Sequence, residues 1–363
     1  MSTMTTRPAA DENLAAKLPD ETLRKWLGDM LLIREFEVRT MQAYQNRLIG
    51  GFCHIYVGQE AVAVGALAAL EATDPIITAY RDHGHALARG MDPKYCMAEM
   101  FGRIGGCAKG KGGSMHMFDK LHHMYGGHGI VGAQCPLAAG LAFARKYTDE
   151  VIENRASTGV AMCFLGDGAL NQGAFHEAMN LAGVLHLPVI YVLENNGYAM
   201  GTSVARGTTM AHDLTAKAAA YGTDSTSIDG MDVMEVYNGM KPIVDRCRRS
   251  VKPAFVEART YRYKGHSMSD PRKYRTKDEE QQYEAQDPIE NLAGFLMSER
   301  KFSEADYDSL TKAVRKQVRE ARRWTDSSPP PGDEELYTDV YADEWGPYRG
   351  TSLPPMMKDT QQE

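Results

Sequence analysis

Two strongly apolar segments separated by one helical stretch constrain the fold of this 363-residue chain more than any other feature. Residues 159–165 (GVAMCFL) and 188–193 (PVIYVL) are short apolar runs, each followed by a turn sequence, and such runs predict buried strands. The pattern of residues 171–185 predicts a helix between them. A strand, a helix and a second strand in this order predict a βαβ unit, whose parallel strands are covered on both faces. We therefore expect an α/β fold in which helices flank a parallel sheet.

Apolar periodicity and turn residues divide the rest of the chain. We expect helices over 21–47, 58–70, 136–147, 232–248, 288–299 and 304–324, and strands over 75–80 and 254–260. Residues 102–132 hold ten glycines and residues 261–284 are mostly polar, so little regular structure is expected in either segment. The predicted organisation is a flexible N-terminal segment (1–20), one α/β domain (21–326) with helical N- and C-terminal extensions, and a proline-rich linker with a C-terminal tail (327–363).

Composition narrows the possible partners. The chain carries 41 Lys and Arg against 48 Asp and Glu, a net charge of −7, which does not favour nucleic acid. The longest nearly apolar run, residues 61–70, is shorter than the roughly 18 residues of a membrane span, so we expect no membrane partner. The six cysteines form no C-x-x-C pair, and residues 1–20 resemble neither a secretory signal nor a convincing transit peptide. These features predict a cytoplasmic location in preference to the mitochondrial matrix.

Several familiar motifs fail their context. Residues 127–132 match G-x-G-x-x-G but follow the polar sequence HHMY, which argues against a dinucleotide site. Residues 105–111 approach a P-loop, yet Gly112 stands where Ser or Thr would bind Mg²⁺. The histidines between 83 and 128 lack zinc-type spacing with cysteine, and no G-x-S-x-G sequence is present.

The two predicted strands end in residues that can bind a metal. Gly166-Asp167-Gly168 follows the first strand, and Asn195-Asn196 comes after 26 intervening residues. Parallel strands place their carboxyl ends at one edge of the sheet, where α/β proteins bind ligands. The Asp167 carboxylate, the Asn196 side-chain carbonyl and the Tyr198 main-chain carbonyl are hard oxygens suited to Mg²⁺ with a diphosphate, and the next helix would point its N-terminus at the anion. The alternative is two unrelated turns.

This GDG-26-NN pattern resembles the thiamine diphosphate motif. The surrounding sequence is similar to that of the alpha subunits of the decarboxylating component of pyruvate dehydrogenase complexes. The similar stretches are GFCHIYVGQEA (51–61), AYRDHG (79–84), GKGGSMHM (110–117), GGHGIVGAQ (126–134), GDGALNQG (166–173), ENNGYAMGTS (194–203) and YRYKGHSMSDP (261–271). The resemblance covers roughly residues 25–330 and implies the thiamine-diphosphate-binding fold of that family.

The resemblance also implies an activity and its residues. The activity is oxidative decarboxylation of pyruvate with thiamine diphosphate and Mg²⁺, followed by reductive acetyl transfer to the lipoyl group of the acyltransferase component. The implied partners are that component and a beta subunit, in a tetramer of two alpha and two beta chains. The implied metal ligands are Asp167, Asn196 and Tyr198, and the implied catalytic residues are His54 and His266. The implied cofactor contacts are Tyr80, Arg81, Gly129, Val131, Asp167, Gly168, Ala169, Asn196, Arg262 and His266. Ser267 matches a serine whose phosphorylation inactivates mitochondrial members.

Three alternatives remain open. Related alpha subunits use branched-chain 2-oxo acids or acetoin, and a non-catalytic subunit with a degenerate site is also possible. Titration of thiamine diphosphate and an assay against these substrates would separate them.

Overall fold

A six-stranded sheet forms the centre of the protein. The computed structural model describes residues 13–157 and 159–340. The strand order is β2-β1-β3-β4-β8-β7, and every neighbouring pair is parallel. The strands are β1 (Ile76–Ala79), β2 (Met124–His128), β3 (Ala161–Gly166), β4 (Val189–Asn195), β7 (Asp224–Asp229) and β8 (Ala254–Arg259). This arrangement confirms the predicted α/β class, and β3, the helix α6 (Gly173–Val184) and β4 form the predicted βαβ unit.

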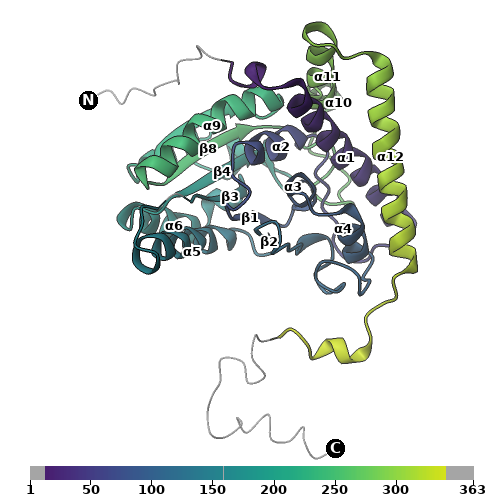
Figure 1. Ribbon diagram of the computed structural model, residues 1–363, viewed down its shortest axis with the longest axis horizontal. Helices are drawn as coiled ribbons and strands as arrows, with labels where there is room; N and C mark the ends of the chain where they lie inside the picture. The colour runs from purple at the N-terminus through teal and green to yellow at the C-terminus, as the bar shows by residue number, and fades with distance from the viewer. Residues whose placement is uncertain (1–12, 158, 341–363) are drawn as a thin grey trace, which may run out of the picture.

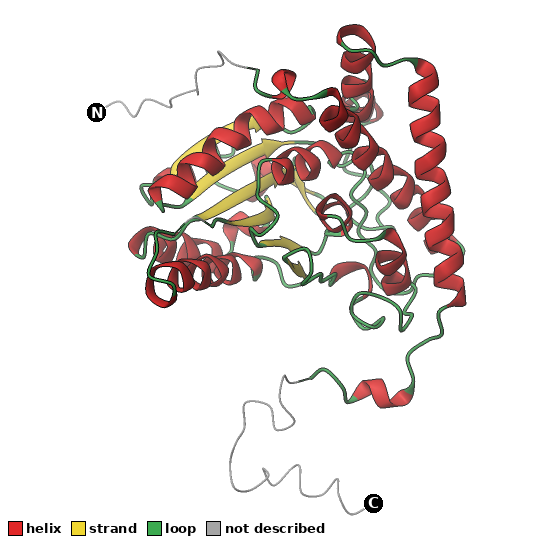
Figure 2. Ribbon diagram, viewed as in Figure 1, coloured by secondary structure: helices red, strands yellow, loops and turns green. Residues whose placement is uncertain are grey.

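Helices cover both faces of the sheet (Figures 1 and 2). For the seven helices expected from the sequence, the observed bounds agree with the predicted ones to within a few residues. The helices are α1 (Asp20–Gln45), α2 (Glu60–Ala68), α3 (His83–Arg89), α4 (Pro93–Met100), α5 (Gln134–Tyr147), α6 (Gly173–Val184), α7 (Val204–Gly207), α8 (Thr215–Ala219), α9 (Val233–Ser250), α10 (Lys277–Glu284), α11 (Pro288–Glu299) and α12 (Glu304–Ser327).

The sheet separates two hydrophobic cores. Successive side chains of a strand point to opposite faces, so Met162 and Phe164 join one core while Cys163 and Leu165 join the other. The larger core packs under α1, α2 and α9, and the smaller core packs under α5 and α6 (Figure 1). Burial on both faces explains why β3 and β4 are apolar along their whole length.

Two edge strands were not expected from the sequence. β2 lies in the glycine-rich segment that we predicted to be irregular, so that prediction is wrong for residues 124–128. A Cβ atom at Gly127 would collide with the Asp82 carboxylate, so glycine serves close packing in this strand. β7 is polar because it is the opposite edge strand, where only Ile228 is buried.

The segment 261–284 also contains a helix, α10, which we did not predict because the segment is mostly polar. Helix α10 has no buried residue, so it lacks the apolar periodicity that identifies most helices. Its start is marked instead by Thr276, whose side chain accepts a hydrogen bond from Glu279 N at 3.2 Å. This T-x-x-E sequence is a capping signal that could have revealed the helix.

Both ends of the described chain touch the main body. In the predicted segment 1–20, Ala15 is buried and its N–H donates to Asn238 Oδ1 at 2.8 Å. Beyond α12, Ile104 N donates to the Pro329 carbonyl, and Lys109 and Lys111 form ion pairs with Glu335 and Asp339. The proposed domain bounds remain a prediction, and most of the predicted tail (341–363) lies outside the described residues. In the described residues, none of the helices is both long and apolar enough to cross a bilayer.

Candidate active site

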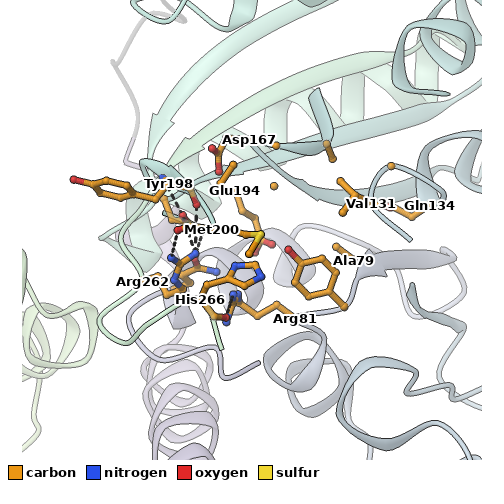
Figure 3. Close-up of a pocket in the computed structure, with 18 residues that line it drawn as sticks. Ala79, Arg81, Val131, Gln134, Asp167, Glu194, Tyr198, Met200, Arg262 and His266 are labelled. Atoms are coloured by element: carbon orange, nitrogen blue, oxygen red, sulfur yellow. Dashed lines mark hydrogen bonds between the residues drawn. The ribbon is translucent and has the colours of Figure 1, made fainter. Parts of the chain in front are cut away.

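A cavity of about 230 Å³ lies at the carboxyl edge of the sheet (Figure 3). Strands β3 and β4 are paired with Gly166 opposite Glu194, so the residues that follow the two strands meet at this edge. Ten of the twelve site residues predicted from the sequence line this cavity. They are Tyr80, Arg81, Val131, Asp167, Gly168, Ala169, Asn196, Tyr198, Arg262 and His266.

The other two predicted residues line an adjoining outer cavity. This cavity of about 640 Å³ includes His54 and Gly129, together with Ser267. It shares Tyr80, Val131, Met200 and His266 with the inner cavity. The structure therefore brings all twelve predicted residues to two adjoining cavities, although they come from segments more than 200 residues apart.

Asp167 is a buried carboxylate without a cationic partner among the described residues. It is 5% exposed, and burial raises its pKa to about 6, despite its backbone hydrogen bond and the nearby Arg262. A buried carboxylate is costly unless a counter-charge compensates it. This position therefore suits a bound cation.

Two further oxygens complete a possible metal site. Asn196 Nδ2 donates to Gln59 Oε1 at 2.9 Å, which fixes the orientation of the amide. The Asn196 Oδ1 atom and the Tyr198 carbonyl both lie 3.4 Å from Arg262 Nη1. One carboxylate and two carbonyl oxygens are the donors that Mg²⁺ prefers. In residues 13–157 and 159–340, no cluster of three His, Cys, Asp or Glu side chains offers an alternative metal site.

Two buried arginines make one side of the cavity positive. Arg81 donates to the Ile55 and His266 carbonyls, each at 2.7 Å, and Arg262 donates to the Met200 carbonyl at 3.2 Å. Neither forms an ion pair with any described carboxylate. Burial lowers the pKa of Arg81, and burial together with the Arg81 charge lowers the pKa of Arg262 to about 10. Figure 3 shows both side chains on the side of the cavity opposite Asp167. Guanidinium groups in this state suit a phosphate group.

His54 and His266 form an aromatic contact where the two cavities meet. Their ring centroids are 5.1 Å apart, and Tyr80 lies 4.6 Å from His54. Burial and the Arg81 charge lower the pKa of both histidines, that of His266 to about 4. Both imidazoles are therefore neutral at pH 7 and can accept or donate a hydrogen bond.

The G-x-G-x-x-G segment also reaches this site. It begins within β2, an edge strand of sequence MYGGH that is not an apolar strand, and it leads into α5. Val131 and Gly132 line the inner cavity, and Gly129 lines the outer one. The segment thus supplies backbone to the same site as the GDG turn.

The helix expected to face the anion starts later than predicted. Helix α6 begins at Gly173, and its first turn is not part of the cavity wall. A short 3₁₀ turn, Ala169–Asn171, comes first, and Gly168 and Ala169 line the cavity. Gly166 also lines it, and a Cβ there would meet no atom within 4 Å, so the glycine leaves this space free for a ligand.

Gln59 and Glu194 are among the cavity residues that the sequence did not predict. Gln59 orients Asn196 from the start of α2, a contact between residues 137 positions apart that no local pattern shows. Glu194 is buried, accepts a hydrogen bond from Tyr56 Oη, and lies 3.2 Å from His85 Nε2. Its only sequence signal is its place at the end of a strand, directly before Asn195-Asn196.

Comparison with known proteins gives one consistent result. The family described as "Dehydrogenase E1 component" matches residues 28–334. The "Pyruvate dehydrogenase E1 component subunit alpha" of Rickettsia bellii is 47% identical over 317 residues, which are 87% of this chain and 95% of that protein. The proteins of the same name from Rhizobium meliloti and Zymomonas mobilis are both 49% identical, over 90% and 88% of this chain and 91% and 88% of their own lengths.

Proposed function

The chain belongs to the dehydrogenase E1 component family, and on that premise we propose that it is the alpha subunit of a pyruvate dehydrogenase (acetyl-transferring). The reaction is oxidative decarboxylation of pyruvate with thiamine diphosphate and Mg²⁺, with reductive transfer of the acetyl group to a lipoyl group. The similarity to three proteins of that name, over most of each chain, supports the choice of pyruvate.

The charge distribution of the inner cavity is the observation that carries the proposal. Arg81 and Arg262 are buried cations without a described carboxylate partner, and Asp167 is a buried anion without a described cation partner. A diphosphate with a bound Mg²⁺ offers the missing partner to each of them. A dinucleotide would place its diphosphate here as well, but it does not account for Asp167, Asn196 and Tyr198 as a group.

Each residue has a part in this assignment. Asp167, Asn196 and Tyr198 would hold Mg²⁺ through oxygen atoms, while Arg81 and Arg262 would bind the diphosphate. When bound, thiamine diphosphate supplies the carbon nucleophile and the electron sink that decarboxylation of a 2-oxo acid requires. The neutral His54 and His266 lie at the junction of the cavities, where they can orient the substrate and hold or release a proton.

The apolar outer surface of α5 and α6 supports a beta-subunit partner. Six large side chains there are 43% to 67% exposed in this chain. They are Leu137, Phe143, Tyr147, Leu181, Val184 and Leu185, and together they define the α5–α6 face. Obligate interfaces bury apolar surfaces of this kind. We assign this face to the beta subunit in a tetramer of two alpha and two beta chains, which in turn meets the lipoyl-bearing acyltransferase component.

The proposed location is the cytoplasm. All six cysteines are free thiols, five of them buried, which fits a reducing compartment.

A steady-state assay of the copurified alpha and beta chains tests the function. We expect turnover with pyruvate to require thiamine diphosphate and Mg²⁺ and to exceed turnover with 2-oxobutyrate, branched-chain 2-oxo acids and acetoin. Preference for a branched-chain 2-oxo acid or acetoin would move the chain to that related class. Absence of thiamine diphosphate binding in a calorimetric titration would instead indicate a non-catalytic subunit.

A further inference from the structure

A buried line of polar side chains runs from α1 to His54. Glu37 and His83 are fully buried, and Ser114 is 4% exposed. His83 Nδ1 lies 3.0 Å from both carboxylate oxygens of Glu37, and His83 Nε2 lies 2.9 Å from Ser114 Oγ. The Ser114 hydroxyl oxygen in turn accepts the backbone N–H of His54 at 3.2 Å. Two further segments, which carry His83 and Ser114, thus connect α1 to His54 of the outer cavity.

The partners of His83 define its protonation state. Its Nε2 atom is 3.0 Å from the Ser114 carbonyl oxygen, which can only accept a hydrogen bond. Its Nδ1 atom faces a carboxylate, which also accepts. Both ring nitrogens therefore carry hydrogen, and His83 is an imidazolium paired with Glu37. Burial opposes this charge, but Glu37, with a smaller contribution from Asp82, raises the pKa of His83 above its ordinary value.

This arrangement is not a hydrolytic triad, although carboxylate, imidazole and hydroxyl occur in that order. The Nε2 atom of His83 donates to Ser114 and has no lone pair with which to take the hydroxyl proton. Ser114 is also too buried to reach a substrate. The line therefore acts on the backbone that it holds: Ser114 Oγ accepts the His54 N–H, and Glu37 Oε1 accepts the Tyr56 N–H at 2.7 Å.

The rings of Tyr80 and His266 contact the His54 ring, and nearby charges act on it as well. Arg81, His266, His83 and Arg262 each disfavour a proton on His54, after the larger effect of burial. The Nδ1 atom of His54 is buried and has no hydrogen-bond partner among the described residues. His54 thus presents a neutral ring with a free nitrogen beside the outer cavity.

We propose that His83 is a positioning residue for His54. The Glu37–His83 ion pair fixes Ser114, and Ser114 fixes the His54 backbone. The His83 charge also disfavours a proton on His54, after the larger effects of burial, Arg81 and His266. The part of this inference that concerns turnover rests on the proposed function, whereas the structural link does not.

Hydrogen exchange in the copurified complex tests the structural link without any assay of activity. Ser114→Ala removes the acceptor of the His54 N–H, and loss of one hydrogen bond of about 1–1.5 kcal/mol corresponds to exchange about tenfold faster. We expect that change in a peptide covering residues 53–56. Ser157→Ala is the matched control, because Ser157 is buried but its hydroxyl has no hydrogen-bond partner among the described residues. Equal exchange in both variants would overturn the link.

The pH profile of turnover tests the effect of the charge. Glu37→Gln should leave His83 neutral, lower kcat, and raise the apparent pKa of the acidic limb of kcat/KM, since His54 then loses one repelling cation. His83→Asn should raise the apparent pKa of the acidic limb of kcat/KM in the same way. If Glu37→Gln does not fold, the His83→Asn variant tests the charge effect in its place. A folded variant with the wild-type profile and kcat would refute the charge effect. If the wild-type complex does not use pyruvate at all, the proposed function fails, while the exchange experiment still decides the link.

Discussion

Replacing Asp167 by asparagine should stabilise the enzyme without its cofactor and destabilise it with the cofactor. Without a metal, the Asp167 carboxylate is buried without a counter-charge, and burial raises its pKa from 3.8 to about 6. The folded protein therefore binds this proton more tightly than the unfolded chain does. Stability from this group is fully present below pH 4 and is lost as the pH rises through 6. An asparagine does not titrate and avoids that loss.

The size of the effect follows from the displacement of the pKa. A pKa of about 6 in the folded protein, against 3.8 in the unfolded chain, corresponds to about 3 kcal/mol of stability lost at pH 7. Because the loss comes from burial, it should be largest when Mg²⁺ and thiamine diphosphate are both absent. Saturation at about 1,000 times Kd adds about 4 kcal/mol to the wild type, whereas the variant, with its metal ligand lost, gains little. The order of stabilities should therefore reverse on adding the cofactor.

Thermal unfolding of the copurified complex measures both effects. Wild type and Asp167→Asn are compared from pH 5 to 8, with and without Mg²⁺ and thiamine diphosphate. We expect the cofactor-free variant to unfold at the higher temperature above pH 6, with the difference shrinking toward pH 5. Equal stabilisation of both proteins by the cofactor would refute the metal assignment. An identical pH dependence would refute the argument from burial.

Three further predictions concern assembly and the outer cavity. The purified alpha chain should show no turnover without its beta partner, because the cavity described here accounts for the diphosphate half of the cofactor; normal turnover by the single chain would contradict this. Val184→Glu should prevent copurification of the beta chain, since it places a charge on the α5–α6 face. Leu336→Glu is the control and should not prevent it, because Leu336 is 73% exposed in the C-terminal segment. Size-exclusion chromatography with light scattering distinguishes the single alpha chain from the assembled complex. Ser267→Glu should abolish activity toward a lipoyl-domain substrate, and Ser267→Ala should retain it. Ser267 lines the outer cavity and directly follows His266, whose carbonyl accepts a hydrogen bond from Arg81, so a new negative charge would attract that guanidinium away from the diphosphate. Equal rates in both variants would refute this.

The parts of the fold that local pattern encodes were predictable from the sequence. β3 and β4 are buried on both faces, so their sequences are apolar throughout and their ends locate Asp167 and Asn196. The edge strands β2 and β7 are only partly buried, and their sequences lack that signal. The glycines of β2 led us to predict irregular structure. Their actual role, leaving space for the Asp82 carboxylate beside Gly127, depends on the tertiary structure and has no local sequence signal.

The candidate site shows the same division. Residues next to strand ends or inside recognisable motifs were predicted, and the structure places all twelve at the two cavities. Gln59 and the Glu37–His83 pair were not predicted, because each acts through a contact between distant segments. A hydrogen bond between residues 46 or 137 positions apart leaves no periodic trace in a single sequence.

The unequal covering of the two cores has a consequence for how cells must produce this protein. The large core is enclosed by long helices of this chain, whereas α5 and α6 cover the small core and still expose the α5–α6 face. A newly made chain with such a face is prone to self-association until a complementary surface covers it. Synthesis of this chain in excess over its partner should therefore yield aggregated or degraded protein, and balanced translation of the two chains becomes a requirement for yield.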